Sequence, residues 1–455
     1  MRPLPLFAAN PTARYRAPLM EHVFVMPILP ILPIIFPILS ILIILLVADC
    51  HQTALAQATK NACLSCHLGL KPELARCARQ WTESAHAPVS VYCEECHGGN
   101  PNSSRMPNIG EGGFMGKPSK RAIPGICDHC HADVLYMQKY DIRVDEENPY
   151  KNSVHGQQLL EKNNQDVASC VDCHGSHDIR KPDDPKSKVN HRNIAETCAR
   201  CHDDNNRMKP YGLPTNQLAQ FKESYHGRIL YRQIKGKNPR LVPSCPGCHG
   251  IHSGKPAGGN QVADACCNCH LNIKRYFQKS IHSLLLKKNQ KPRCIDCHGY
   301  HNIPYPGEEL FTGESSSHCG TCHPRQSQQY QNGLKLRAII IQTRKFAEKS
   351  RDRIDKIKKD LGIDISSLNM KMDDALQTLE DAVKATHSQD LQTVSRIIQN
   401  TYKHIASIDQ QISQHYQEVR QRKRWLCRVL FIIGVAFSLV AYQRNRIKNQ
   451  GLKTL

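Results

Sequence analysis

The stretch that decides the fold reads Ser153-Val154-His155, Cys170-Val171-Asp172-Cys173-His174-Gly175-Ser176-His177 and Cys198-Ala199-Arg200-Cys201-His202. It holds two copies of Cys-x-x-Cys-His, which is the attachment sequence of c-type haem. In that chemistry both thiols form thioethers with the haem vinyl groups, and the following histidine binds the iron. The stretch therefore predicts two covalent haems, and it leaves His155 and His177 without an assigned role.

The same arrangement recurs four times, and such repeats decide how the whole chain is interpreted. Each repeat consists of Ser-x-His, a first Cys-x-x-Cys-His motif and a second one. Repeat one contains His86, Cys93–His97 and Cys127–His131; repeat two is the stretch above; repeat three contains His226, Cys245–His249 and Cys266–His270; repeat four contains His282, Cys294–His298 and Cys319–His323. One further motif, Cys63–His67, precedes repeat one.

These nine motifs use 18 of the 22 cysteines. Single Cys-x-x-Cys pairs also serve zinc sites, but nine pairs, each followed by His and mostly in one frame, favour haem. The sequence therefore predicts nine covalently attached haems c. The attachment residues are Cys63, Cys66, Cys93, Cys96, Cys127, Cys130, Cys170, Cys173, Cys198, Cys201, Cys245, Cys248, Cys266, Cys269, Cys294, Cys297, Cys319 and Cys322. The proximal iron ligands are His67, His97, His131, His174, His202, His249, His270, His298 and His323.

The second axial position of each iron decides between two functions. A second histidine gives a saturated haem suited to electron transfer, whereas an open position permits substrate chemistry. Nine histidines remain as distal candidates once His129, which lies inside a motif, is set aside: His86, His155, His177, His191, His226, His252, His282, His301 and His318. The four Ser-x-His residues and the three in Cys-His-Gly-x-His (His177, His252 and His301) recur in register, whereas His191 and His318 do not.

Repeat one breaks this register. Asn100 stands where the other repeats have His177, His252 and His301. One haem in the N-terminal region is therefore expected to use a histidine from elsewhere, a methionine such as Met106 or Met115, or no distal ligand. An active site, if the chain has one, is expected in this region.

The formal charge of +21 has a simple explanation. Nine haems bring roughly 18 propionate charges that need basic partners, and the Lys and Arg residues are scattered between the motifs rather than clustered. Nucleic acid is therefore not an expected partner.

The N-terminal part, residues 1–58, is predicted to be an export signal. Residues 23–47 are almost wholly apolar and long enough to span a bilayer. Four prolines interrupt them, and Ala54-Leu55-Ala56 provides a cleavage site. This favours a cleaved signal peptide, with a retained membrane segment as the alternative. A lipoprotein at Cys50 is disfavoured, because Asp49 stands where a small residue is needed.

The expected fold is mainly α with much irregular loop. Residues 59–325 form a haem-cored domain of short helices, because about thirty residues per haem cannot bury a conventional core. Residues 326–425 lose the motifs and acquire apolar stripes at 3- and 4-residue steps, which predicts long antiparallel helices or an oligomerising coiled coil. Residues 426–442 are expected to be a transmembrane helix, followed by a basic tail at 443–455.

Two details accompany this expectation for the helical region. Met370 and Met372 are expected to be core residues of the stripe. His387, His404 and His415 are expected on polar faces rather than as ligands.

Residues 60–325 resemble the multihaem c-type cytochromes of anaerobic and metal- or nitrogen-cycling bacteria, through their Ser-x-His-Gly and Cys-x-x-Cys-His-Gly-x-His elements. The resemblance implies closely spaced haems that form a wire. Membrane-anchored relatives pass quinol electrons to periplasmic reductases, usually from an N-terminal anchor. Ammonia-forming nitrite reductases carry a catalytic Cys-x-x-Cys-Lys motif, whereas all nine motifs here end in His.

The expected function is therefore electron transfer along mostly bis-His haems in anaerobic respiration. The protein is expected in the inner membrane with its haem domain in the periplasm, between a membrane donor such as quinol and a periplasmic or outer-membrane redox protein. The alternative is an oxidoreductase acting on a small nitrogen or sulfur compound at one open haem. A storage or filament role is the third reading, and residues 326–425 would then serve homo-oligomer assembly.

Overall fold

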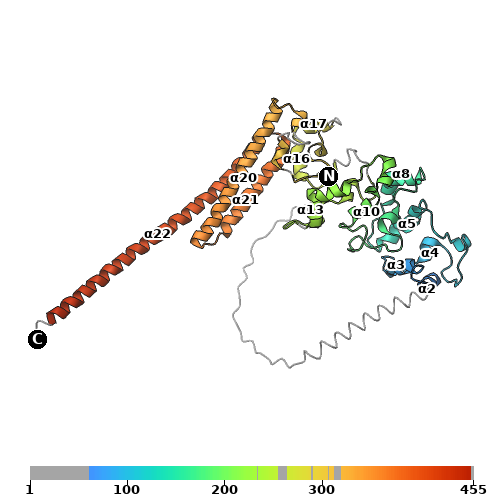
Figure 1. The fold of residues 1–455 in the computed structure, drawn as a ribbon, viewed down its shortest axis with the longest axis horizontal. Helices are drawn as coiled ribbons and strands as arrows, with labels where there is room; N and C mark the ends of the chain where they lie inside the picture. Colours follow the sequence, from blue (N-terminus) through green and yellow to red (C-terminus); the bar gives the residue numbers. More distant parts are fainter. Residues whose placement is uncertain are drawn as a thin grey trace, which may run out of the picture. The chain divides into compact units, whose positions relative to one another are not determined.

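The structure is a computed structural model that describes residues 61–232, 234–254, 264–287, 291–305, 307–311 and 319–451. The described part is mainly helical and contains no strand, which confirms the predicted fold class at that level. The apolar segment 23–47, the cleavage site and His318 lie outside the described residues. Figure 1 shows the short helices of the motif region and the long C-terminal helices.

The chain divides into two compact units. The first consists of the residues up to Arg79 together with Ser90–Phe114, and the second of Gln80–Val89 and Met115–Leu455. The second unit therefore includes the C-terminal helices as well as most of the motif region.

The motif region contains only short helices. They are α2 Ala62–Leu68, α3 Arg76–Thr82, η1 Ala87–Val89, α4 Cys93–His97, η2 Glu111–Gly113, α5 Ile123–His131, α6 Val134–Gln138, α7 Glu147–Lys151, α8 Val154–Leu160, α9 Cys170–His174, α10 Ile194–His202, α11 Asn205–Met208, η3 Lys209–Tyr211, α12 Gln217–Glu223, α13 Tyr225–Arg232, η4 Pro239–Leu241, α14 Cys245–His249, η5 Cys266–Asn268, α16 Leu271–Phe277, α17 Ile281–Lys287, α18 Cys294–His298, η6 Glu308–Phe311 and α19 Cys319–Cys322.

Three long helices follow: α20 Gln328–Leu361, α21 Ser366–Ala385 and α22 Leu391–Gly451, with the short η7 Thr386–Ser388 before α22. They pack on one another as an antiparallel bundle, because only short turns join them and each contacts the other two. Gly362, in the left-handed conformation with φ of 64°, ends α20.

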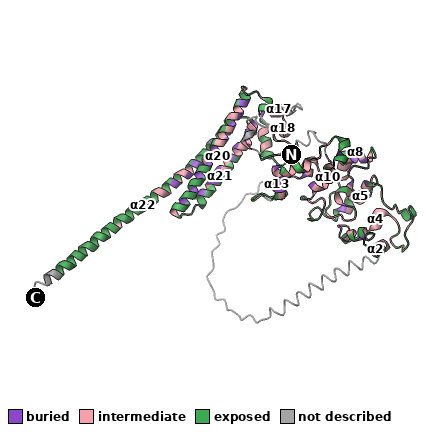
Figure 2. Ribbon diagram, in the orientation of Figure 1, coloured by how far each residue is buried: buried purple, intermediate pink, exposed green. Residues whose placement is uncertain are grey.

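The bundle holds the apolar core of the described residues. All three clusters of buried apolar side chains lie in it, and Figure 2 shows the buried positions running along the facing sides of these helices. The stripe predicted on α22 contributes Val394, Ile398, Ile405, Ile408 and Ile412 to these clusters. Amphipathic periodicity therefore identifies the packing face correctly.

One residue of the other stripe was predicted wrongly. Met372 is fully buried on α21, as expected, but Met370 is 64% exposed. The two residues are 200° apart around a helix of 3.6 residues per turn, so they lie on opposite faces and cannot both enter the core.

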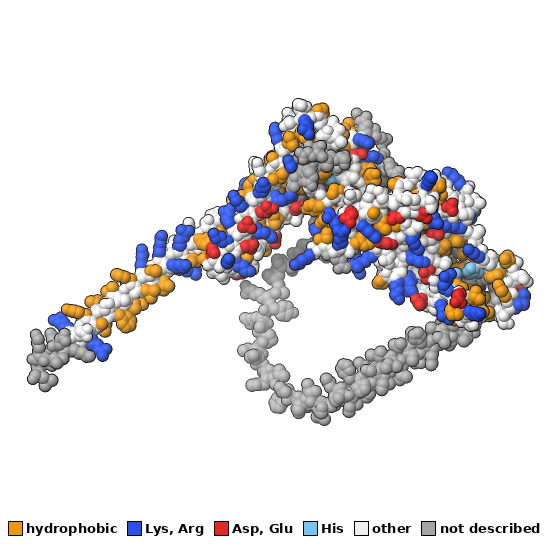
Figure 3. Space-filling model, in the orientation of Figure 1, with side chains coloured by type: hydrophobic (Ala, Val, Ile, Leu, Met, Phe, Trp, Pro, Cys, Tyr) orange, Lys and Arg blue, Asp and Glu red, His pale blue; other side chains and the backbone are white. Residues whose placement is uncertain are grey.

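Helix α22 extends beyond the bundle without a break. Its distal part carries Trp425, Phe431 and Phe437, which are 66%, 73% and 73% exposed. It is the one described helix long and apolar enough to cross a membrane, and Figure 3 shows its apolar surface after a group of basic side chains. The predicted segment 426–442 lies within this stretch.

Candidate functional site

The first motif of each repeat forms a helix of one and a half turns, which ends at the motif histidine. In such a helix residues i, i+3 and i+4 lie on one face, so both cysteines and the histidine point the same way. A glycine in a positive-φ conformation follows each helix; Gly175, with φ of 90°, donates its N–H to the Val171 carbonyl at 3.0 Å. The other members of this set are Gly98, Gly250 and Gly299. The glycine stops the helix directly after the motif histidine.

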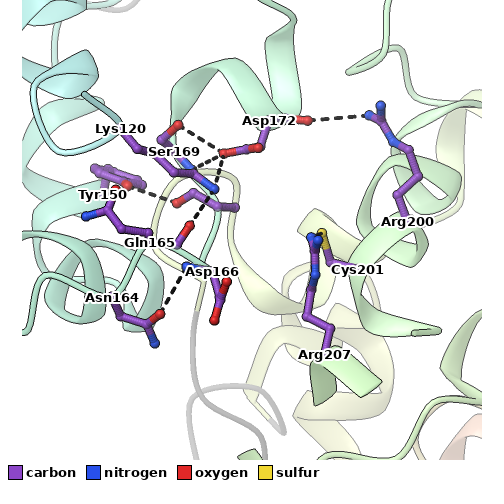
Figure 4. A network of polar contacts seen from close by, with 11 residues as sticks. Lys120, Tyr150, Asn164, Gln165, Asp166, Ser169, Asp172, Arg200, Cys201 and Arg207 are labelled. Carbon is purple, nitrogen blue, oxygen red and sulfur yellow. Dashed lines mark hydrogen bonds and ion pairs between the residues drawn. The ribbon is translucent and has the colours of Figure 1, made fainter. Parts of the chain in front are cut away.

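In repeat two, a polar network holds the first motif in place (Figure 4). The Asp172 carboxylate accepts the Ser169 N–H at 2.7 Å, which caps the motif helix, and forms an ion pair with Lys120 at 3.1 Å. Lys120 also donates to the Gln165 carbonyl, and Arg200, inside the second motif, donates to the Asp172 carbonyl at 3.4 Å. Burial raises the pKa of Asp172, but the Ser169 and Lys120 hydrogen bonds outweigh it and hold that pKa below its usual value.

The serine of Ser-x-His has a structural role. In repeat three the buried Ser224 hydroxyl donates to the Phe221 carbonyl at 2.6 Å and accepts the Gly227 N–H at 3.0 Å. This N-cap fixes His226 in the first turn of α13. Ser153 and Ser280 make the same pair of bonds in their repeats. Each serine follows an aromatic residue by three positions (Trp81, Tyr150, Phe221 and Phe277), a signature that the sequence analysis missed.

Each Ser-x-His histidine faces the second motif of its own repeat. The ring centroids are 6.3 Å apart for His86 and His131, 6.1 Å for His155 and His202, 6.2 Å for His226 and His270, and 6.2 Å for His282 and His323. Their interplanar angles run from 28° to 53°.

The first motifs of repeats two, three and four take their partner from the next part of the chain. His174 of repeat two lies 6.2 Å from His252 of repeat three, and His249 of repeat three lies 6.1 Å from His301 of repeat four. No fifth repeat follows, and His298 of repeat four lies 6.0 Å from His387 of the bundle. These three pairs are closer to parallel, with interplanar angles of 18° to 27°.

The separation common to the seven pairs fits one metal ion between two imidazoles. A metal–imidazole nitrogen bond of about 2.0 Å, plus roughly 1.1 Å from that nitrogen to the ring centroid, gives about 6.2 Å for two rings on opposite sides of one ion. Among the described residues, no group of three or more His, Cys, Asp or Glu is placed to hold a metal. Each pair therefore suits a metal whose other ligands come with a cofactor, as in haem.

The protonation state of the paired histidines agrees with metal binding. Burial, together with a smaller effect of the facing histidine, lowers the pKa of both His174 and His298 to about 4. Burial likewise lowers the pKa of His252 and His387. The rings are therefore neutral near pH 7, which is the form that binds metals.

Some buried polar atoms need partners that the described chain does not supply. Arg228 Nε, two residues after His226, and His301 Nδ1 are buried and make no hydrogen bond within the described part of the chain. Buried polar groups are rarely left unpaired. A haem propionate would suit Arg228, whereas Arg180 and Arg232 already form ion pairs with protein carboxylates.

The cysteines show the order in which the motifs lie. A thiol–thiol hydrogen bond joins Cys127 to Cys170, and the same contact recurs between Cys198 and Cys245 and between Cys266 and Cys294. Each contact links the second motif of one repeat to the first motif of the next. Within repeats, Cys173 and Cys198, Cys248 and Cys266, and Cys297 and Cys319 interact electrostatically. In the second compact unit, sequence order is thus also the spatial order of the motifs.

No family model, curated protein or solved structure matches this chain.

The remaining candidates have other surroundings. His191 Nε2 lies 3.1 Å from the Pro239 carbonyl oxygen, and no described motif histidine faces its ring. His177 Nδ1 lies 3.4 Å from the Ser176 hydroxyl. His67 is exposed and has no ring partner among the described residues.

His387 is the one ligand candidate that the sequence analysis placed wrongly. It was expected on a polar face, but it is partly buried and faces His298. A signal for it was present, because it is the first histidine after His323 and the first-motif ligands come from the following segment. His404, in contrast, is exposed as expected.

Proposed function

We propose that this protein is a nonahaem c-type cytochrome that relays single electrons along a chain of mostly bis-His haems in anaerobic respiration. The seven histidine pairs with ring centroids 6.0 to 6.3 Å apart carry this proposal. Haem bound there supplies an iron that changes oxidation state without exchanging ligands.

The chain's own residues supply the fixed geometry. The capped motif helices and the Ser-x-His caps hold both rings of a pair before electrons move, so little rearrangement accompanies transfer. Contacts between cysteines of successive motifs would bring neighbouring cofactors close. Ligands taken from the following repeat would tie repeat two to repeat three and repeat three to repeat four.

The membrane part of the proposal rests on α22, whose exposed apolar stretch would anchor the chain in the inner membrane. Haem is attached to apocytochromes outside that membrane, so the motif region would lie in the periplasm. The partners would be redox proteins and a membrane donor such as quinol on one side, and a periplasmic or outer-membrane acceptor on the other.

The alternative is a multihaem oxidoreductase that acts on a small nitrogen or sulfur compound at one open haem. It is kept because exposed His67 has no ring partner among the described residues.

Two measurements test the relay. The pyridine haemochrome assay should give nine haems per chain, and electron paramagnetic resonance (EPR) of the oxidised protein should be dominated by low-spin haem. A count far below nine haems per chain, or mostly high-spin haem, would contradict the proposal.

A matched pair of variants tests the ligand assignment. His252→Ala should convert one low-spin haem into a high-spin haem, because it removes the ring that faces His174. His191→Ala should leave the low-spin signals unchanged. A spectral change in His191→Ala alone would reverse the assignment.

A further inference from the structure

The motif Cys63–His67 has a definite place in the repeat pattern. It precedes the Ser-x-His of repeat one, as the second motifs of repeats one to three precede the Ser-x-His of the following repeat. The Cys63 and Cys93 thiols also interact electrostatically. In the second compact unit, the first cysteine of a second motif contacts the first cysteine of the following repeat's first motif, as Cys127 contacts Cys170. Cys63–His67 thus occupies the position of a second motif.

Second motifs find their partner upstream. The partner histidine precedes the motif histidine by 41 to 47 residues in all four repeats. The equivalent positions for His67 are residues 20–26, which contain His22 but no Ser-x-His and lie outside the described residues. The pattern therefore supplies no distal histidine for His67.

The same pattern explains Asn100. In repeats three and four this position holds His252 and His301, which face the first motif of the preceding repeat. Residues 1–62 contain no first motif, so among the residues of this sequence a histidine at position 100 would face no motif histidine. Asn100 is therefore not the cause of an open site, and the iron in question is the one bound by His67.

The surroundings of His67 leave it accessible. The start of α2 is fixed, since Ala62 donates its N–H to the Pro101 carbonyl at 2.8 Å and Asn61 donates to Glu94 at 2.7 Å. The end of the same helix is open, because Cys66 and His67 are both exposed. Met106 and Met115, the methionines considered as ligands, are 84% and 42% exposed.

We propose that the haem attached to Cys63 and Cys66 is open opposite His67 and binds a small molecule that carries a lone pair on carbon, nitrogen or oxygen. This inference rests on the proposed function, because it needs haem at the motif. It identifies the open haem of the alternative function as the haem attached to Cys63 and Cys66. Ligand binding at this iron neither adds nor removes electrons.

The test uses the full-length protein in detergent, reduced and titrated with carbon monoxide. The wild type should bind carbon monoxide. Cys63→Ala/Cys66→Ala should contain eight haems and bind one molecule fewer per chain. The matched control, Cys294→Ala/Cys297→Ala, removes the haem between His298 and His387, so it should also contain eight haems but bind as much carbon monoxide as the wild type.

A wild type that binds no carbon monoxide, or a Cys63→Ala/Cys66→Ala variant that binds as much as the wild type, would overturn the inference. In either case a count of nine haems in the wild type would still support the electron relay, so failure of this inference can be distinguished from failure of the proposed function. EPR of the wild type needs no variant: it should contain a high-spin signal that cyanide converts to low spin. A high-spin signal that appears only in His22→Ala or His51→Ala would mean that the substituted histidine is the ligand opposite His67. That result would contradict the inference.

Discussion

The ring of His298, in the first motif of repeat four, lies 6.0 Å from the ring of His387, at the turn between the second and third helices of the bundle. His387 Nδ1 is 3.0 Å from the Lys384 carbonyl, a bond that would orient the ring when Nδ1 carries the proton. The bundle thus contributes the ring that faces His298 in the motif region, and helix α16 contacts both η7 and α21 beside it.

His387→Ala should open the haem of Cys294–His298 and leave the haem count at nine. The variant should gain one high-spin haem and bind one more carbon monoxide per chain than the wild type, because no other described histidine faces His298. His404→Ala, an exposed substitution on α22, is the control and should change neither quantity. Unchanged spectra in His387→Ala would contradict the pairing.

Ser224→Ala should weaken the ligand without removing it. The substitution deletes a buried N-cap, which typically costs about 0.5–2 kcal/mol. It also removes the hydroxyl donor to the Phe221 carbonyl, which keeps only the Ser224 N–H. The low-spin signal of the haem at His270 should therefore be lost at a lower temperature than in the wild type. Ser407→Ala removes an exposed hydroxyl bonded within its own helix, and it should not shift that transition.

Met372→Ala should lower the free energy of unfolding of the bundle by about 2–5 kcal/mol, because the side chain is fully buried. Met370→Ala, on the opposite face of the same helix, should change it by less than about 0.5 kcal/mol. Urea unfolding monitored by circular dichroism measures both. Equal effects in the two variants would show that α21 packs with a different face.

Deletion of residues 426–455 should release the protein from the membrane fraction and keep nine haems per chain. The deletion removes the exposed apolar stretch of α22 and leaves the bundle core, whose last buried α22 residue is Ile412. If the truncated chain stays in the membrane, residues 23–47 are retained as an anchor rather than cleaved.

The sequence predicts much of this site because covalent attachment requires a local motif. Cys170 to His174 can be recognised without knowing the fold, and the recurrence of Ser-x-His indicates the second ligands. Which histidine faces which motif histidine is a long-range property. His252 follows its own motif by three residues, yet it faces His174 in the preceding repeat.

His387 shows the same limit at greater distance. It lies 64 residues beyond the last motif histidine, in a segment whose periodicity indicates only helix packing. Its role depends on how the bundle docks beside α16, which no local pattern encodes. The Met370 error has a simpler origin, since two residues in alternate positions cannot share a helical stripe.

The unbroken course of α22 fixes the distance between the bundle end at Leu391 and the exposed apolar stretch that begins at Trp425. At 1.5 Å per residue, the 34 steps from Leu391 to Trp425 span about 50 Å, and the His298–His387 pair lies at the Leu391 end. A carrier confined to the bilayer at the level of Trp425 could not touch that pair. With the proposed anchor in place, electrons that enter or leave at that pair would need a partner that extends about as far from the membrane, so the length of α22 would limit which partners can reach it.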